Sequence, residues 1–133
     1  MDETHKMHNF DHEKLNVYQA AIEFVVATET IVRQFPNGRG YLIDQLQRAG
    51  SSILLNIAEG AGEFSANEKM RFYRMARRSA TESAGILDIC MRLNLADENM
   101  IAISRGLLLR IVSMLTKMVR PCSVTQTGTQ TFT

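Results

Sequence analysis

The sequence lacks tryptophan and has only two prolines and two cysteines among its 133 residues. Because proline interrupts helices, Pro36 and Pro121 leave a long stretch between them in which helices can continue. Cys90 and Cys122 have no CxxC pairing and no zinc-ligand spacing around them, so we predict free thiols in a reducing compartment. A chain of this length is expected to form one domain with a core of useful size.

Long hydrophobic runs are also missing. The longest nearly uncharged run, 106–118, is interrupted by Arg110 and Lys117 and is shorter than the roughly 20 residues of a membrane-spanning helix. The polar start of the chain, MDETHKMHNF, has no apolar centre of the kind found in signal peptides. These absences predict a cytoplasmic protein that makes no membrane contact.

The patterns typical of active sites are few. His5, His8 and His12 have the spacing of one helix face, but no cysteine accompanies them, and we interpret them as part of a solvated terminus. The sequence has no E-x-x-H motif of di-iron bundles and no glycine-rich phosphate loop. The alternative is an active site in which Glu59 and Glu82 act as paired carboxylates. We predict a protein that is not an enzyme and that carries no metal or cofactor.

Charge is unevenly distributed along the chain, although the formal net charge is only +1. Residues 1–68 hold five Lys and Arg against ten Asp and Glu, which gives a balance of −5. Residues 69–133 hold ten Lys and Arg against four Asp and Glu, which gives +6. This asymmetry indicates either a basic face that contacts phosphate or charge-complementary contacts between chains, and charge alone does not choose between them.

Apolar residues recur every three or four positions over four long stretches, a spacing that predicts four helices. The clearest start signal is the capping box from Ser65 to Glu68. The glycines that follow Glu59 predict that the second helix ends in a left-handed conformation. With their caps included, we expect helices at about 11–34, 41–59, 65–94 and 97–120.

The first helix carries a regular apolar stripe, which we expect to face the core. The residues of this expected stripe are Leu15, Tyr18, Ile22, Val25, Val26 and Val32. Short connections between the helices predict an all-α fold, an antiparallel up-down-up-down four-helix bundle over residues 10–120. We expect a flexible leader at 1–9 and a disordered Thr/Gln-rich tail at 121–133.

The last two helices carry apolar and basic residues beyond those that a bundle core requires. Leu107 and Met114 widen the apolar surface of the fourth helix, which predicts burial against another subunit. Arginines on the third helix recur at helical spacing and form a basic stripe, either a solvated face or one that binds phosphate or a subunit. The candidate nucleic-acid-binding residues are Arg71, Arg74, Arg77, Arg78, Arg110, Lys117 and Arg120. Few aromatic residues lie among them, which favours backbone contact over base stacking.

The second helix gathers an unusual set of polar residues on and near one face. Buried polar groups must be paired, and paired groups fix geometry more than they add stability. We therefore predict a structural hydrogen-bonded network that sets helix register or subunit contacts. Its members are Arg48, Ser52, Asn56, Glu59 and, from the third helix, Glu82.

The stretch at 42–83 resembles the signature of the 23S rRNA intervening-sequence proteins, a family of four-helix bundles. The shared pattern includes N-I-A-E-G at 56–60, with Arg48 and Ser52 before it. An F-x-x-x-A-x-x-S-x-x-E pattern follows at Phe72, Ala76, Ser79 and Glu82. The resemblance extends over about residues 10–120.

This resemblance implies protomers that assemble into a ring-like homo-pentamer without catalytic activity. It also implies similarity to the accessory variability protein of diversity-generating retroelements, a basic pentamer that binds a reverse transcriptase and nucleic acid. One departure is that Leu54 and Leu55 stand where the family has Pro-Ser, which predicts a more regular second helix with a more apolar outer face. Two functions stay open: a nucleic-acid-binding accessory factor for RNA or DNA, which we favour, and a protein-interaction scaffold without nucleic-acid contact.

Overall fold

The computed structural model describes residues 10–119 of the chain. Within this range the chain is all-helical and contains no strand, as predicted. Its elements are a short 3₁₀ helix η1 (Asp11–Lys14) and four α-helices, α2 (Asn16–Val32), α3 (Gly40–Ala61), α4 (Ala66–Arg92) and α5 (Glu98–Val119). The predicted leader, the predicted tail and Arg120 lie outside the described residues.

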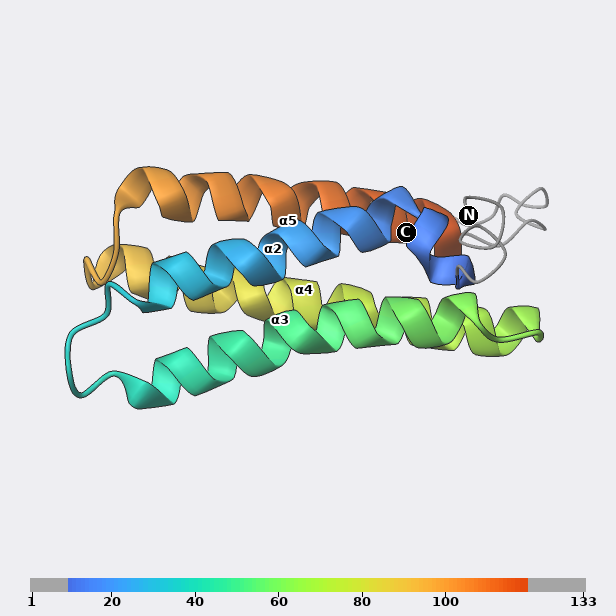
Figure 1. Ribbon diagram of the computed structural model, residues 1–133, viewed down its shortest axis with the longest axis horizontal. Coiled ribbons are helices and arrows are strands. Elements are labelled where there is room, and N and C mark those ends of the chain that lie inside the picture. Colours follow the sequence, from blue (N-terminus) through green and yellow to red (C-terminus); the bar gives the residue numbers. More distant parts are fainter. Residues whose placement is uncertain (1–9, 120–133) are drawn as a thin grey trace, which may run out of the picture.

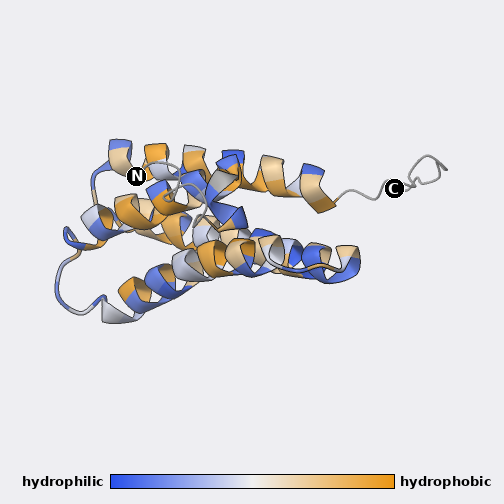
Figure 2. Cartoon of the chain, turned by 45° about the vertical axis from the view of Figure 1, so that its right-hand side comes forward, coloured by the Kyte–Doolittle hydropathy of each residue, from blue (hydrophilic) through white to orange (hydrophobic). Residues whose placement is uncertain are grey.

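The four α-helices lie side by side (Figure 1). Each of α2 and α4 packs against both α3 and α5, whereas no Cα atom of α2 lies within 8 Å of a Cα atom of α4. The α2–α3 and α4–α5 connections lie at one end of the molecule and the α3–α4 connection lies at the other (Figure 1). Hydrophobic residues line the inner sides of the helices (Figure 2). The largest fully buried side chains are Val17, Phe24, Ile31, Leu42, Leu46, Ile53, Ile57, Leu87, Ile101, Leu108, Ile111 and Leu115.

The first helical stretch differs from its prediction in both its start and its buried face. Instead of one helix from Asp11, η1 and α2 are separated at Leu15, whose backbone is extended with φ −80° and ψ 130°. Phe24 is fully buried, while Val26 of the expected stripe is 62 % exposed. Phenylalanine has more apolar area to remove from water than valine, so the face with the ring becomes the buried one. Of the expected stripe, Val32 is buried as predicted.

Two predicted helix starts are confirmed by their capping hydrogen bonds. The hydroxyl of Ser65 accepts a hydrogen bond from the backbone N–H of Glu68 at 3.2 Å. The carboxylate of Asp97 accepts one from the backbone N–H of Met100 at 3.1 Å. Each bond satisfies an amide that has no partner within its helix.

The predicted end of α3 is wrong in its backbone conformation. Gly62 has φ −88°, which is the right-handed region rather than the left-handed one. The ammonium group of Lys69 instead donates to the carbonyl oxygens of Gly60 and Ala61 at 3.2 and 3.1 Å, satisfying the helix end. Gly60 is required for a different reason, because a Cβ there would lie 2.7 Å from the ring of Tyr73.

Helix α5 is long and apolar enough to cross a membrane by length and composition alone, with a mean hydropathy of 1.3 in its most apolar window. Core helices of soluble bundles have the same composition, so this is weak evidence for a membrane span. Ile101, Ile111 and Leu115 of α5 are fully buried among the other helices. The absence of membrane contact stays a prediction.

Candidate functional site

A polar groove between α3 and α4 contains part of the predicted polar network. The hydroxyl oxygens of Ser52 and Ser79 lie 2.8 Å apart and join the two helices. The side-chain amide of Asn56 donates to the backbone oxygen of Ser52 at 2.9 Å and to its hydroxyl at 3.1 Å. All three side chains are half-buried. Because both amide hydrogens of Asn56 are used within α3, its carbonyl oxygen is the atom left to accept a hydrogen bond from outside.

The same contacts fix how α3 lies against α4. Ser52 faces Ser79, and Gly60 faces the ring of Tyr73, so earlier residues of α3 face later residues of α4. This register places Arg48 close to the level of Glu82. Both side chains are exposed, and no hydrogen bond or ion pair joins them within residues 10–119.

The structure thus brings together Ser52, Asn56 and Glu82 of the predicted network, which line one hollow between α3 and α4, and places Arg48 and Glu59 outside that hollow. Arg48, Glu59 and Glu82 are all exposed. Glu59 lies eleven residues beyond Arg48, about 16 Å along α3 at 1.5 Å per residue, so Glu59 and Glu82 lie at different levels of the groove. That separation argues against paired carboxylates within one chain. Burial of the whole set by another subunit stays a prediction.

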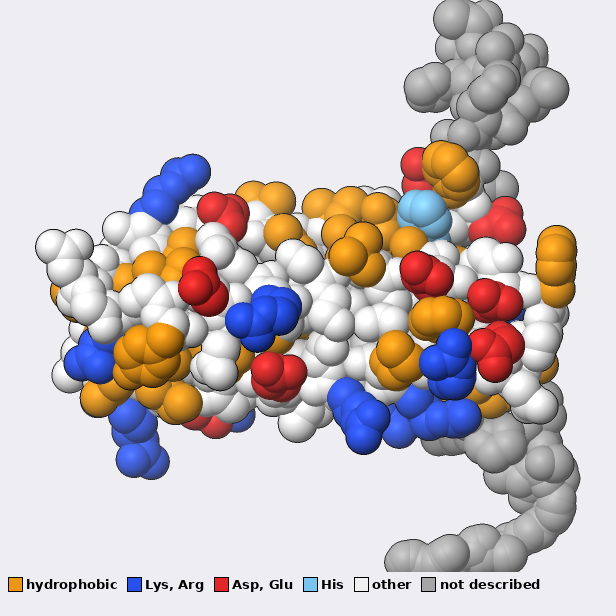
Figure 3. All heavy atoms as spheres, turned by 90° about the horizontal axis from the view of Figure 1, so that it is seen from below, with side chains coloured by type: hydrophobic (Ala, Val, Ile, Leu, Met, Phe, Trp, Pro, Cys, Tyr) orange, Lys and Arg blue, Asp and Glu red, His pale blue; other side chains and the backbone are white. Residues whose placement is uncertain are grey.

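Of the basic stripe on α4, Arg71 and Arg74 are exposed, whereas Arg78 lines the hollow between α3 and α4 together with Ser52 and Asn56. Arg71 is held by Glu68, with contacts of 3.0 and 3.1 Å, and its guanidinium lies 4.6 Å from the ring centroid of Phe72. Arg74 and Arg78 are exposed and form no ion pair in the described part of the chain. A group of basic side chains gathers at the lower right of the face shown in Figure 3, beside several acidic ones.

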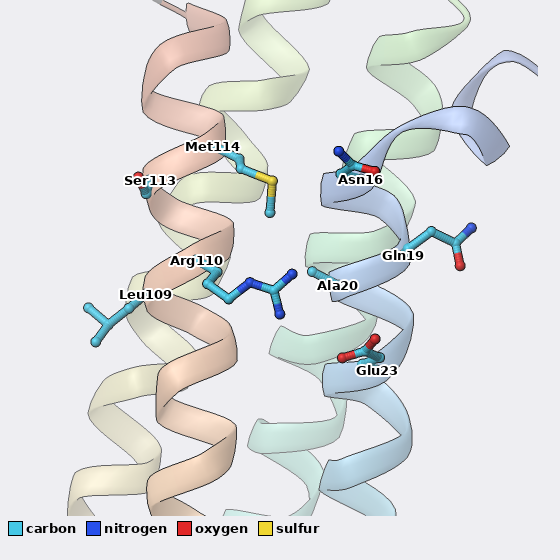
Figure 4. A pocket seen from close by; sticks show the side chains of 8 residues that line it. All are labelled: Asn16, Gln19, Ala20, Glu23, Leu109, Arg110, Ser113 and Met114. Atoms are coloured by element: carbon cyan, nitrogen blue, oxygen red, sulfur yellow. The ribbon is translucent and has the colours of Figure 1, made fainter.

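The other predicted basic residues point elsewhere. Arg77 is half-buried and donates to the hydroxyl of Thr116 at 3.4 Å, so it faces α5. Arg110 is exposed and lines a hollow between α5 and α2, where its guanidinium extends toward the helix that carries Glu23 (Figure 4). Lys117 is exposed near the end of α5. The candidate phosphate contacts therefore lie on more than one surface of the chain.

Two features of the surface were missed by the sequence reasoning. Phe64 is fully exposed in the α3–α4 connection, next to Glu63. A mostly apolar groove runs between α4 and α5. The residues that line it are Ala80, Thr81, Ala84, Arg105, Leu108, Leu109 and Val112. The isolated Phe64 between polar neighbours was a visible signal, whereas the groove depends on how α4 and α5 pair.

Reactive groups are scarce in the described residues. Burial raises the pKa of the Cys90 thiol, and Cys90 forms no disulfide. Burial also raises the pKa of the Tyr73 hydroxyl. A raised thiol pKa lowers the fraction of reactive thiolate at neutral pH, so Cys90 has the character of an inert core residue. Residues 10–119 contain no group of three His, Cys, Asp or Glu side chains that could hold a metal ion.

Comparison with known proteins finds a matching family model and similar solved structures. The family model of the 23S rRNA-intervening sequence protein matches residues 13–117. A crystal structure at 1.70 Å of a protein with unknown function from the S23 ribosomal protein family of Bacteroides thetaiotaomicron has a similar fold, with a TM-score of 0.72 and 20 % sequence identity. The similarity covers 79 % of this chain and 99 % of that chain. No curated protein matches the sequence.

Proposed function

This chain belongs to the 23S rRNA-intervening sequence protein family, as its motifs predicted, and we propose that it is a non-enzymatic accessory factor that binds nucleic acid. The proposal takes the protein as a cytoplasmic homo-oligomer, a ring-like pentamer of antiparallel up-down-up-down bundles, without membrane contact. A finer version gives it a reverse transcriptase as partner. That version is supported only by the resemblance to the accessory variability protein of diversity-generating retroelements.

One observation carries the proposal. Arg74 and Arg78 are exposed on the same face of α4, one turn apart, which is about 6 Å along the helix axis. Neither arginine forms an ion pair in the described part of the chain, in contrast to Arg71. Exposed guanidinium groups without carboxylate partners are suited to phosphate oxygens, which they bind without regard to base sequence.

The test is binding of a structured RNA and of a duplex DNA across a salt series. Each phosphate contact with duplex DNA contributes about −0.9 to the slope of log affinity against log salt. Losing two contacts in Arg74→Gln/Arg78→Gln should therefore make the duplex slope shallower by about 1.8. The matched control is Arg33→Gln/Arg39→Gln, which removes the same charge outside α4 and should leave the slope nearly unchanged.

Equal slopes for the two double variants would contradict a specific role for α4, because net charge alone would then explain the binding. No binding by the parent protein at low salt would contradict the proposed function itself. The alternative would then be a protein-interaction scaffold. That alternative is favoured by Phe64, a fully exposed aromatic side chain in an acidic connection.

A further inference from the structure

Helix α2 has a second apolar face that its own chain leaves uncovered. Val26 is 62 % exposed, and Ile22, one turn earlier, is only half-buried. At 100° per residue, Glu23 and Glu29 lie on either side of Val26, about 60° away around the helix. Both carboxylates are exposed, and α2 contains no lysine or arginine. Glu29 accepts a hydrogen bond from the side-chain amide of Gln47 on α3 at 3.0 Å, and Glu23 lines the hollow that also contains Arg110. The outer face of α2 is thus an apolar ridge with an acidic residue on each flank.

The groove between α4 and α5 has an arginine at each end. It is bounded at one end by the Arg77–Thr116 hydrogen bond of 3.4 Å and at the other by the Arg105–Asp88 ion pair of 3.0 Å. From 77 to 88 is eleven residues of α4, about 16 Å or three helical turns. Arginine therefore stands at both ends of an apolar floor, and only the Arg105 end has a carboxylate of its own.

Two glycines beside this groove leave space that their own chain does not fill. Gly50 and Gly60 of α3 are explained within the chain, because an added Cβ would lie 3.2 Å from Phe24 and 2.7 Å from Tyr73 respectively. An added Cβ at Gly85 of α4 or Gly106 of α5 would meet nothing within 4 Å. A helix-interior glycine costs about 1 kcal/mol relative to alanine.

The positions of these two glycines connect them to the groove. Gly85 lies one turn from Thr81 and from Asp88 along α4, and both of these residues stand at the groove. Gly106 lies one turn before Leu109, which lines the groove on α5. Both edges of the groove therefore leave space that a helix of another chain can occupy.

We propose that the outer face of α2 of one copy packs into the α4/α5 groove of a second copy. The ridge at Val26 meets the apolar floor, and the flanking carboxylates of Glu23 and Glu29 approach the arginines at the groove ends. Since α2 packs against α3 and α5 and has no Cα atom within 8 Å of α4, the outward-facing ridge and the groove lie on different sides of the bundle. The contact is therefore heterologous, and its repetition closes a ring or extends a filament. The inference rests on the proposed function only for the homo-oligomer, not for nucleic-acid binding.

The test is the molar mass of the full chain in solution without nucleic acid, measured by light scattering on a size-exclusion column. Val26→Glu places a charge on the ridge, and Gly85→Leu fills the space at the edge of the groove. Each variant should reduce the mass of the assembly to that of one chain, 15.0 kDa. Circular dichroism checks that each variant keeps its helices, which we expect because neither position contacts the core.

The matched control is Leu55→Glu, the same kind of change at a side chain that is 60 % exposed on α3, outside both surfaces. It should keep the parent mass. A parent protein of 15.0 kDa at all concentrations would overturn the inference, as would an unchanged assembly in both Val26→Glu and Gly85→Leu. All three variants retain Arg74 and Arg78, so the salt series on nucleic acid tests the proposed function separately.

Discussion

The interface between α3 and α4 is closely packed, whereas the interface between α4 and α5 has an open groove. Between α3 and α4 the chain fills its own gaps, with the Tyr73 ring against Gly60 and a hydroxyl contact of 2.8 Å between Ser52 and Ser79. Between α4 and α5 an apolar groove stays open, and Gly85 beside it has no neighbour within 4 Å of an added Cβ. The first contact completes the fold, whereas the second leaves room for another chain.

The same contrast separates the two faces of α2 and gives the largest expected effect. Phe24→Ala removes a fully buried ring and should lower the free energy of unfolding by about 3–5 kcal/mol. Val26→Ala on the exposed face should change the stability of a single chain by less than about 0.5 kcal/mol. Urea unfolding of both variants measures the difference. Similar losses would show that the two faces contribute alike to the fold.

A smaller loss is expected at the filled α3–α4 contact. Gly60→Ala pushes a methyl group to within 2.7 Å of the Tyr73 ring and should destabilise the chain by about 1–3 kcal/mol, as overpacking does. Unfolding in urea gives the value. The control is Gly40→Ala, at a position where an added Cβ meets nothing within 4 Å. A Gly60→Ala variant as stable as this control would contradict the close packing described for α3 and α4.

The hydroxyl contact across the same two helices should matter less. Ser52→Ala and Ser79→Ala should each cost about 0.5–1.5 kcal/mol, the usual net value of one hydrogen bond. A double-mutant cycle isolates the pair, because the double variant should cost less than the sum of the single ones. Strict additivity would mean that the two hydroxyls do not stabilise each other.

At the open α4–α5 interface, replacing a glycine should raise the stability of the chain rather than lower it. Gly85→Ala removes a poor helix former without meeting any atom of its own chain, so it should raise the stability of an isolated chain by up to about 1 kcal/mol. The measurement belongs in a Val26→Glu background, which removes the proposed subunit contact. A loss of stability there would mean that the space beside Gly85 is already used within the chain.

The sequence was sufficient for the helices and for their polar starts, because these depend on local spacing. The periodicity predicted four helices, and Ser65 and Asp97 act as the predicted caps. The end of α3 was predicted less well, since its capping lysine comes from the next helix, eight residues beyond Ala61.

The buried face of α2 was predicted wrongly because both faces carry apolar residues at helical spacing. Their relative burial depends on which neighbours can enclose the Phe24 ring, and Gly50 on α3 provides that space. The groove between α4 and α5 could not be predicted from the spacing of apolar residues. It joins Ala84 to Leu108 and Leu109, which lie 24 and 25 residues later in the chain, and only the register of the two helices brings them together.

The measurement that tests the central claim most directly is the mass of an equimolar mixture of Val26→Glu and Gly85→Leu. The first variant keeps an intact groove, and the second keeps an intact α2 ridge, so one productive contact forms between them. The predicted result is a dimer of twice the 15.0 kDa chain mass, with each variant alone remaining a single chain. A mixture that contains only single chains would contradict the docking of α2 into the α4/α5 groove.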